Sequence, residues 1–435
     1  MQDRWDVVVI GSGPAGLAAA ASAATKKVRC CIIEREERPG GILKQCIHDG
    51  FGLIRYNARL TGPEYAWREL EQVNQLGVPI FLSTYIDSVQ RTQDGFRMSG
   101  VNPNGSFSLA AKAIVLATGC RERTARQIFL HGSRPAGVFT AGLAQYFINV
   151  QGYLPTQKCV ILGSGDIGLI MARRLVLEGA EVEGVYEIMP QPSGLPRNLA
   201  QCLDDYGIPL YLSTTVTRVH GRDRLEGVTT MQVDLRQQPV PGTERYIECD
   251  SLILSVGLIP ENEIAVELGA EIDPVTKGPV VNDAMMCTVP GLFSCGNSLH
   301  VSDLVDYVSE TGETAGREAA HYTEGHAVEN SVQVEIPVHK KSPIAYFVPQ
   351  RVRKLRCLPG DTLTAFFRVN RELQSARLKI SAVLDEENLI PIFTHTYRFL
   401  RPSEMERIDV GITAEHLIAG AAHIIGLEAE IEEAE

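Results

Sequence analysis

The chain has 435 residues, a formal net charge of -12, and 44% apolar and 22% charged residues. This length exceeds one ordinary core, so two or three domains are expected. The acidic balance without a long basic stretch argues against a nucleic-acid partner. The sequence has no run of roughly 18 apolar residues and no recognisable signal peptide after Met1, so we expect a cytoplasmic protein without an integral membrane segment.

Residues 6–34, DVVVIGSGPAGLAAAASAATKKVRCCIIE, predict a strand, a glycine-rich turn, a helix and a second strand. Continuous Val/Ile runs are typical of parallel strands that are buried on both faces. Gly11, Gly13 and Gly16 suit the tight turn, the approach of backbone to a pyrophosphate, and the packing of the helix on the sheet. The helix start offers free N–H groups to phosphates. Glu34 follows Gly11 by 23 positions and is expected to accept a hydrogen bond from a ribose hydroxyl.

Residues 158–187, KCVILGSGDIGLIMARRLVLEGAEVEGVYE, repeat this pattern. The glycines are now Gly163, Gly165 and Gly168, and Glu187 follows Gly163 by 24 positions. An acid at this position repels the 2′-phosphate of NADP, and no Arg follows within the next several residues, which favours NAD. A vestigial unit that binds nothing stays an alternative.

An alternating stretch follows each unit, at residues 77–119 and 207–237, and predicts further strands. Residues 302–316, SDLVDYVSETGETAG, predict a helix. From about Val332 the chain changes to short β-rich runs separated by turns, which predict a separate β domain. EHLIAGAAHIIG is then expected to be helical, and the acidic tail LEAEIEEAE is expected to be solvated and without a function.

The ten cysteines are scattered, and only Cys30 and Cys31 are adjacent. Because the sequence contains no C-x-x-C, we expect neither a zinc site, nor an iron-sulfur cluster, nor the dithiol of a thioredoxin reductase, and no residue is assigned to a metal. Most of the thiols are interpreted as packed side chains in a reducing compartment. Cys120, Cys287 and Cys295 are included, since the sequence gives them no ligand geometry.

Two more glycine turns follow strands, at AIVLATG and LILSVGLIPEN, and VPGLFSCGN ends a third strand. The order of all these motifs resembles the two-dinucleotide-binding-domain flavoproteins, also called pyridine nucleotide-disulfide oxidoreductase-like proteins, over roughly residues 5–325. The resemblance implies an α/β fold of two Rossmann-like domains, the second inserted in the first, plus a small C-terminal β-rich domain. It implies FAD as one cofactor and NAD(H) as the other. The implied ranges are 1–125 and 253–330 for the FAD domain, 126–252 for the NAD domain, and 331–435 for the β-rich domain.

The same resemblance implies the cofactor-binding residues. The family's late Gly-Asp contacts the flavin ribityl chain, and here Asn297 replaces the Asp, which keeps a hydrogen-bonding oxygen but loses the charge. Leu304 and Val305 would begin a helix whose positive end faces the flavin pyrimidine. The full implied set is Gly11, Gly13, Pro14, Ala15, Gly16, Glu34, Arg35, Gly41, Ile42, Ile86, Ala117, Thr118, Gly119, Gly163, Gly165, Asp166, Ile167, Gly168, Glu187, Gly257, Gly296, Asn297, Leu304 and Val305.

In this family the chain crosses close to the flavin at Gly40 and Gly41, so Cys46 and His48 are the catalytic candidates. A Cys46 thiolate would be a redox partner of the flavin, but a single Cys is also a common packing residue. His48 would exchange a proton with the reduced flavin or contact the substrate. The charged residues Arg121–Arg123 would orient a phosphate or clamp a domain interface, or would be solvated and paired with each other.

The segments PGGILKQCIHDGFGL and LTGPEYA look similar to a narrower group of flavin- and NAD-binding subunits. These accompany glycerol-3-phosphate dehydrogenase-like or 2-hydroxyacid oxidase-like flavoproteins, or belong to opine and amino-acid dehydrogenase complexes. The similarity implies an oligomeric electron-transfer subunit that moves a hydride between NAD(H) and FAD. Its partners would be the flavoprotein subunit of a dehydrogenase or oxidase and a small cysteine-containing electron-transfer protein. Two alternatives stay open: a stand-alone NADH oxidase or reductase of a small acceptor, and a scaffold subunit with an empty NAD site.

Overall fold

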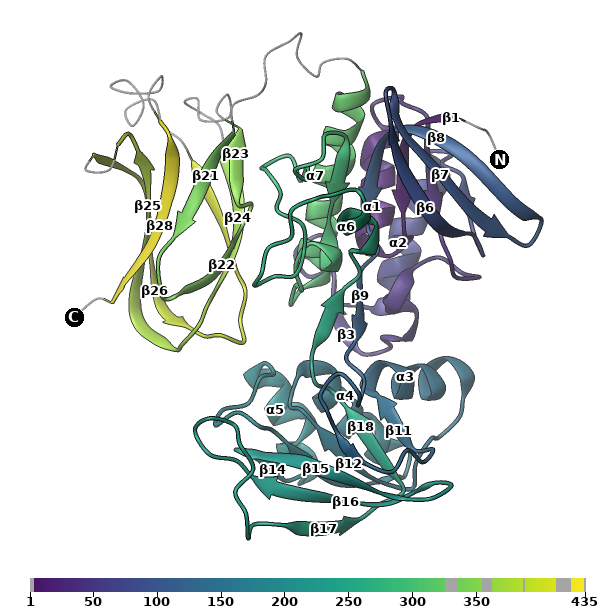
Figure 1. Cartoon of the computed structure of the whole chain (residues 1–435), viewed down its shortest axis with the longest axis vertical. Helices are drawn as coiled ribbons and strands as arrows, with labels where there is room; N and C mark the ends of the chain where they lie inside the picture. The colour runs from purple at the N-terminus through teal and green to yellow at the C-terminus, as the bar shows by residue number, and fades with distance from the viewer. Residues whose placement is uncertain (1–3, 325–334, 354–361, 386–387, 412–423, 434–435) are drawn as a thin grey trace. The chain divides into compact units, whose positions relative to one another are not determined.

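The computed structural model of the chain divides into two compact units (Figure 1). One unit joins Met1–Cys120 to Pro260–Glu435, and the other is Arg121–Ile259. Both contain a Rossmann-like sheet, so the predicted α/β class is confirmed. The residues that the structure describes are 4–324, 335–353, 362–385, 388–411 and 424–433.

The first unit is built on a seven-stranded sheet in the order β5-β2-β1-β8-β7-β6, with β20 also against β8. The first predicted strand-helix-strand unit is present, and its strands pair in parallel. Val7, Val8 and Val9 are fully buried, as the continuous apolar run predicts. The parallel strands are β1 (Arg4–Ile10), β2 (Cys30–Ile33), β5 (Ile80–Phe81), the second half of β8 (Gly105–Leu116) and β20 (Leu292–Ser294), whereas β6 (Tyr85–Thr92) and β7 (Gly95–Asn102) form an antiparallel extension.

Helices α1 (Pro14–Ala24) and α7 (Val305–Thr323) pack directly on each other. A Cβ atom at Gly312 of α7 would lie 2.2 Å from the Ala15 carbonyl oxygen, and one at Gly316 would lie 1.9 Å from the Ala19 carbonyl oxygen. Glycine is therefore required where the two backbones approach. The rest of this unit contains η1 (Gly41–Gln45), β3 (Asp49–Phe51), β4 (Leu60–Thr61), α2 (Gly62–Gln75), α6 (Glu263–Glu267) and η4 (Gly296–Ser298).

The second unit contains the second predicted strand-helix-strand unit, β12 (Lys158–Leu162), α4 (Asp166–Leu177) and β13 (Glu181–Tyr186). They belong to a five-stranded parallel sheet in the order β11-β18-β12-β13-β14, and a four-stranded sheet accompanies it. Its remaining elements are β10 (His131–Gly132), β11 (Val138–Thr140), α3 (Ala141–Tyr146), η2 (Phe147–Gln151), α5 (Pro196–Cys202), η3 (Asp204–Tyr206), β14 (Leu210–Tyr211), β15 (Thr214–Gly221), β16 (Leu225–Gln232), β17 (Arg245–Glu248) and β18 (Ser251–Leu254). The short strands β9 (Cys120–Glu122) and β19 (Leu258–Pro260) pair where the chain passes between the units.

The C-terminal region is β-rich, as predicted, and its strands are drawn in green to yellow in Figure 1. A five-stranded sheet (β23-β21-β28-β25-β26) and a three-stranded sheet (β22-β24-β27) share one apolar core. The β-rich region belongs to the first compact unit and is not separated from it. The predicted division into three domain ranges therefore stays a prediction. Its strands are β21 (Glu335–Lys340), β22 (Ile344–Val348), β23 (Arg351–Arg353), β24 (Thr362–Val369), β25 (Leu373–Val383), β26 (Leu389–Leu400), β27 (Glu406–Gly411) and β28 (Gly426–Glu433).

The prediction of a solvated acidic tail is wrong. Residues Gly426–Glu433 form β28, which pairs with β21 on one side and β25 on the other. Leu427 and Ala429 are buried and alternate with glutamates, so one face of the strand enters the core and the other carries the charges. The helix predicted for EHLIAGAAHIIG lies almost entirely outside the described residues, and its last residue, Gly426, already belongs to β28.

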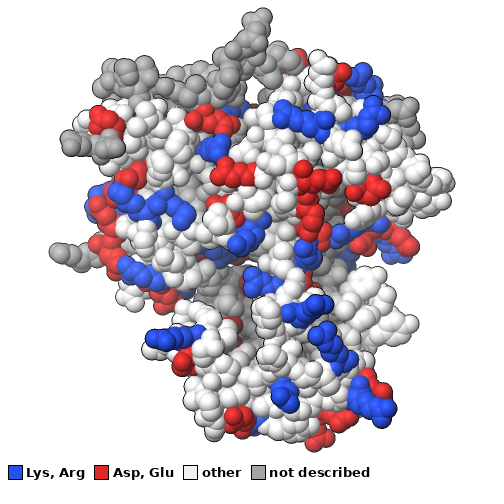
Figure 2. Space-filling view, in the orientation of Figure 1, with Lys and Arg blue, Asp and Glu red and all other residues white. Residues whose placement is uncertain are grey.

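No helix among the described residues is long and apolar enough to cross a membrane. On the face shown in Figure 2, Lys and Arg side chains lie among Asp and Glu side chains.

Candidate nucleotide sites

The first glycine turn is tightly packed against the Ala117–Gly119 turn. Gly11 has φ +105°, and a Cβ atom there would lie 2.3 Å from the Ala117 carbonyl oxygen. A Cβ atom at Gly16 would lie 1.9 Å from the Gly11 carbonyl oxygen. Only glycine fits at either position, so the spacing that suggested a nucleotide turn has a direct steric cause.

The start of α1 is open to an anion. Its N-cap is Gly13, Pro14 is its first residue, and the described residues supply neither a side-chain cap nor an acid in the first turn. The amide groups of Ala15 and Gly16 are therefore available to a phosphate, and the helix dipole favours negative charge there. Gly41 passes so close to this turn that a Cβ atom added at Gly41 would lie 2.9 Å from the Gly13 Cα atom. This cradle of bare backbone fits the pyrophosphate of FAD.

Glu34, at the end of β2, is held beside the turn and is only 6% exposed. Its carboxylate accepts hydrogen bonds from the Ser12 amide at 2.7 Å and from the Ser12 hydroxyl at 2.5 Å, and its second oxygen accepts from the Glu36 amide at 2.8 Å. The serine orients the acid that was predicted to bind ribose. The sequence reasoning missed Ser12, although serine occupies the same place in both glycine motifs.

The second unit repeats this packing with Ser255 in place of Ala117. Gly163 has φ +94°, and its Cβ atom would lie 2.1 Å from the Ser255 carbonyl oxygen. The Ser255 hydroxyl accepts a hydrogen bond from the Gly168 amide at 3.1 Å. Gly165, the N-cap of α4, has no side-chain cap from any described residue. Gly257, with φ +100°, follows this strand as Gly119 follows β8.

Glu187 is held as Glu34 is. It accepts hydrogen bonds from the Ser164 amide at 3.0 Å and from the Ser164 hydroxyl at 2.6 Å, and also from the Ser193 hydroxyl at 3.2 Å. Asp166 accepts from the Leu195 amide at 2.8 Å, so the loop after β13 folds back onto the glycine turn. In the first unit the loop after β2 also returns to the glycine turn, because the Gly40 amide donates to the Ser12 carbonyl at 2.9 Å.

Four other predicted cofactor residues have partners within the chain, and one is exposed. Arg35 pairs with Glu261 at 3.0 Å, and the Thr118 hydroxyl donates to the Glu261 carbonyl at 2.6 Å. Ile86 is buried in the core of the first sheet. Ile167 packs partly buried against the core of the second unit, and Ile42, directly after Gly41, is 55% exposed. Their assignment to cofactors stays a prediction.

The late glycine motif borders the start of α1. A Cβ atom at Gly296 would lie 2.7 Å from the Ala15 Cβ atom, and the Gly296 amide donates to the Thr311 hydroxyl at 2.9 Å. Asn297 accepts from the Ser302 amide at 3.1 Å, so the amide oxygen that replaces the family's carboxylate shapes the chain before α7. Leu304 is the N-cap of α7 and Val305 its first residue, as predicted, and no described side chain caps this helix.

Cys46 and His48 follow η1, on the segment that leaves the Gly40–Gly41 crossing. The Cys46 thiol donates to the Ile42 carbonyl at 3.3 Å, and burial raises the pKa of Cys46 to about 12. A thiolate is thus disfavoured at neutral pH, which supports the packing alternative. The His48 ring lies 5.0 Å from the Phe51 ring. Both catalytic assignments stay predictions.

The other flagged residues have structural roles. The Glu122 carboxylate accepts from the Gly142 amide at 2.7 Å and so caps α3. The Cys120 sulfur accepts from the Asn297 side-chain amide at 3.8 Å. Cys287 and Cys295 are both buried, and burial raises the pKa of each thiol, to about 12 for Cys295.

A charged network that the sequence did not indicate, buried except for Glu313, fixes the segment after His48. The Arg55 guanidinium pairs with Glu69 at 2.5 Å and with Glu313 of α7 at 2.8 Å, and the Arg55 amide donates to Asp306 at 3.1 Å. The Tyr56 hydroxyl also donates to Glu69, at 2.6 Å. The network ties this segment to the first turns of α7.

Comparison with known proteins gives the family. The model of the pyridine nucleotide-disulphide oxidoreductases matches residues 5–319. An opine oxidase subunit of Agrobacterium tumefaciens is 26% identical over 74% of this chain and 65% of its own length. Hydrogen cyanide synthase subunit HcnB of Pseudomonas protegens is 27% identical over 61% of this chain and 59% of its own. The chain therefore spans less than two thirds of these relatives. The fold resembles thioredoxin reductase of T. acidophilum, with TM-score 0.59 and 21% identity over 75% of this chain and 100% of that one.

Proposed function

Because the chain belongs to the pyridine nucleotide-disulphide oxidoreductase family, whose members use FAD and a pyridine nucleotide, we propose that it moves a hydride between NAD(H) and FAD as the electron-transfer subunit of a larger dehydrogenase. When bound, FAD supplies the two-electron chemistry. The residues of this chain bind and orient: the bare start of α1 receives the pyrophosphate, and Glu34 receives a ribose hydroxyl.

The preference for NAD over NADP is proposed from the serine-carboxylate pair, which occurs in both units. Ser12 and Glu34 build a site for the adenosine of FAD, whose 2′-hydroxyl is not phosphorylated. Ser164 and Glu187 reproduce the same hydrogen bonds in the second unit. A carboxylate at this place accepts from a hydroxyl and repels a phosphate, and residues 188–196 contain neither Lys nor Arg. The second unit is thereby suited to the same type of adenosine.

Two observations support an external electron partner. The opine oxidase relative and hydrogen cyanide synthase subunit HcnB are both named as subunits of larger enzymes. Within this chain, the Cys46 thiol donates to the Ile42 carbonyl and burial raises its pKa, which disfavours a thiolate that would act as a redox partner of the flavin. The partner proposed here is the flavoprotein subunit of a dehydrogenase or oxidase.

Anaerobic titration of the purified FAD-loaded protein tests this function. We expect NADH to bleach the visible flavin absorbance at concentrations at least tenfold below those of NADPH. Glu187→Gln should remove most of that discrimination and keep FAD bound. Its matched control, Glu34→Gln, should weaken FAD and leave the preference for NADH unchanged.

A second measurement separates the subunit from the alternatives. Slow oxidation of NADH in air, accelerated by an artificial acceptor, is expected of a subunit that delivers electrons to a partner. Rapid oxidation of NADH in air would instead favour a stand-alone oxidase. Flavin that neither nucleotide bleaches would contradict the proposal and favour a scaffold with an empty second site.

A further inference from the structure

The segment Ser298–Leu304 joins the late glycine turn to the start of α7. It borders the first nucleotide site, since Gly296 contacts Ala15 of α1. Gly312 of α7 lies against Ala15 and Gly316 against Ala19, so the two helices run parallel. At 1.5 Å per residue, α7 therefore begins about 10 Å beyond the first turn of α1. A nucleotide whose pyrophosphate lies at the start of α1 would have to extend over this distance to reach the start of α7.

The start of α7 has unsatisfied polar groups. This helix of 19 residues begins at Leu304 without a side-chain cap from the described part of the chain. Just before it, the Ser302 hydroxyl is buried and has no hydrogen-bond partner among the described residues. Buried polar groups are normally satisfied, so both features point to a ligand at this helix start.

One carboxylate in this segment is held from the C-terminal β region. Asp303 forms an ion pair with the Arg368 guanidinium of β24, and it accepts from the Met405 amide at 2.6 Å. Arg368 also donates to the Tyr346 hydroxyl at 3.1 Å and to the Pro402 carbonyl at 3.2 Å. A single guanidinium thus joins three parts of the β region to Asp303, and both charged side chains are less than one fifth exposed.

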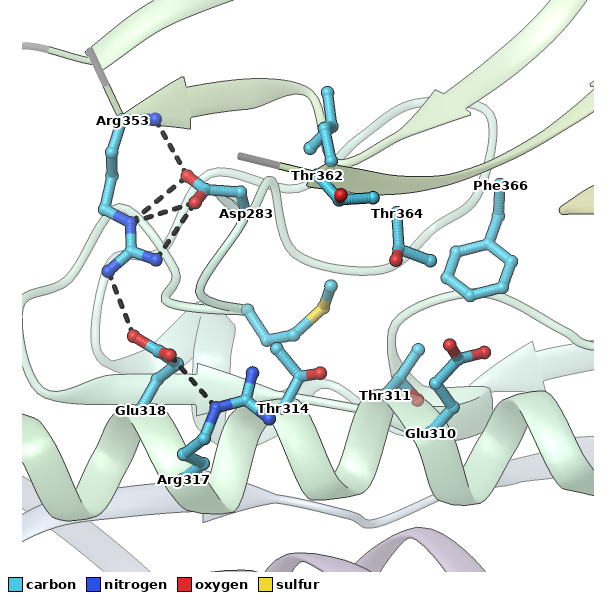
Figure 3. Close-up of a pocket in the computed structure, with 12 residues that line it drawn as sticks. Asp283, Glu310, Thr311, Thr314, Arg317, Glu318, Arg353, Thr362, Thr364 and Phe366 are labelled. Carbon is cyan, nitrogen blue, oxygen red and sulfur yellow. Dashed lines mark hydrogen bonds and ion pairs between the residues drawn. The ribbon is translucent and has the colours of Figure 1, made fainter. Parts of the chain in front are cut away.

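The β region also contacts α7 farther along. Arg407 forms a bidentate ion pair with Glu310, at 2.6 and 2.8 Å. Arg353 pairs with Asp283 at 2.9 Å and with Glu318 at 3.0 Å, around the polar pocket between α7 and β24 that Figure 3 shows. Arg353 and Arg368 therefore belong to the same interface, but only Arg368 holds the start of α7.

We propose that Arg368 is a positioning residue: through Asp303 it fixes the segment before α7, and so it sets both the affinity for FAD and the reduction potential of the bound flavin. This inference rests on the proposed function. The partial positive charge of the helix start stabilises the negative charge that a flavin gains on reduction. If the start of α7 is released, the site loses contacts to the nucleotide and the reduced flavin loses stabilisation.

Arg368→Gln tests the proposal, and Arg353→Gln is the matched control in the same interface. Arg368→Gln is expected to raise the dissociation constant of FAD about tenfold and to make the flavin midpoint potential more negative. Arg353→Gln is expected to lower the thermal midpoint to a similar extent and to leave both flavin properties near those of the wild type. Arg368→Lys, which keeps the charge beside Asp303, should recover part of the affinity. The readouts are flavin fluorescence on rebinding and spectroelectrochemical titration.

The outcomes separate the two proposals. Equal effects of Arg353→Gln and Arg368→Gln on the flavin, or no effect of either, would overturn the positioning role and leave the proposed function intact. Wild-type protein that binds no FAD would overturn the proposed function first, and the inference with it. If Arg368→Gln does not fold, Asp303→Asn breaks the same ion pair at nearly constant volume, and a lower FAD affinity is then the expected result.

Discussion

His300 is a buried titratable side chain that packs beside the aromatic rings of Tyr346 and Phe366. It is 1% exposed, its ring lies 5.3 Å from that of Phe366, and neither ring nitrogen has a hydrogen-bond partner in the described structure. Burial, assisted by the nearby Arg368 charge, lowers the pKa of His300 to about 4. Below about pH 6.5 the His300 imidazole is therefore protonated in the unfolded chain but stays neutral in the folded chain. Stability is fully present above that pH and is lost as the pH falls toward 4.

His300→Phe should remove this acid sensitivity. We expect the difference in unfolding free energy between variant and wild type to shift by about 2 kcal/mol in favour of the variant from pH 7 to pH 5. Denaturant unfolding at several pH values measures it. His131→Phe, at an exposed histidine, is the control. Parallel stability curves for wild type and His300→Phe would contradict the assignment.

The site residues that the sequence predicted are those whose role depends on local spacing. Gly11, Gly16 and Glu34 stand at fixed distances along one strand, turn and strand, so their meeting follows from the local fold. The contact between Asp303 and Arg368 joins residues far apart in the chain, and nothing in either local sequence selects the other. Such residues become visible only when the tertiary structure brings them together.

Strand β28 illustrates the same limit at the level of an element. Its glutamates led to the prediction of a solvated tail. The alternation of charged and apolar side chains indicates a strand with one buried face only if a partner strand is known. With β21 and β25 on its two sides, the apolar positions enter a shared core. The βαβ units could be predicted because their strands are buried on both faces and appear as continuous apolar runs, which can be recognised without knowing the partner strands.

Leu427→Ala should destabilise the C-terminal sandwich by about 2–5 kcal/mol, since Leu427 is 1% exposed and its loss leaves a cavity. Glu432→Gln, on the outer face of the same strand, should change stability by less than about 1 kcal/mol, because its ion pair with Lys379 is exposed. Urea unfolding of the full chain compares them. Similar effects of the two substitutions would contradict the burial of one face of β28 and favour a solvated tail.

At the level of the whole molecule, two similar candidate nucleotide sites occur in separate compact units. Ser12→Ala and Ser164→Ala remove equivalent hydroxyls from equivalent carboxylates. Each should weaken only its own nucleotide, by about ten- to a hundredfold, as expected for one hydrogen bond to a charged group. Retention of FAD and calorimetric titration with NADH measure the two effects. If both variants lose both nucleotides equally, the sites are not independent.

The interruption of the first unit has a consequence for biosynthesis. Strand β20 completes the central sheet against β8, and the whole of Arg121–Ile259 lies between them in sequence. Translation therefore produces every residue of the inserted unit before it produces the strand that completes the central sheet of the first unit. The inserted unit can fold during translation, whereas the sheet of the first unit keeps an open edge at β8 until β20 is made. The nascent chain would thus complete the proposed pyridine nucleotide site before the proposed flavin site.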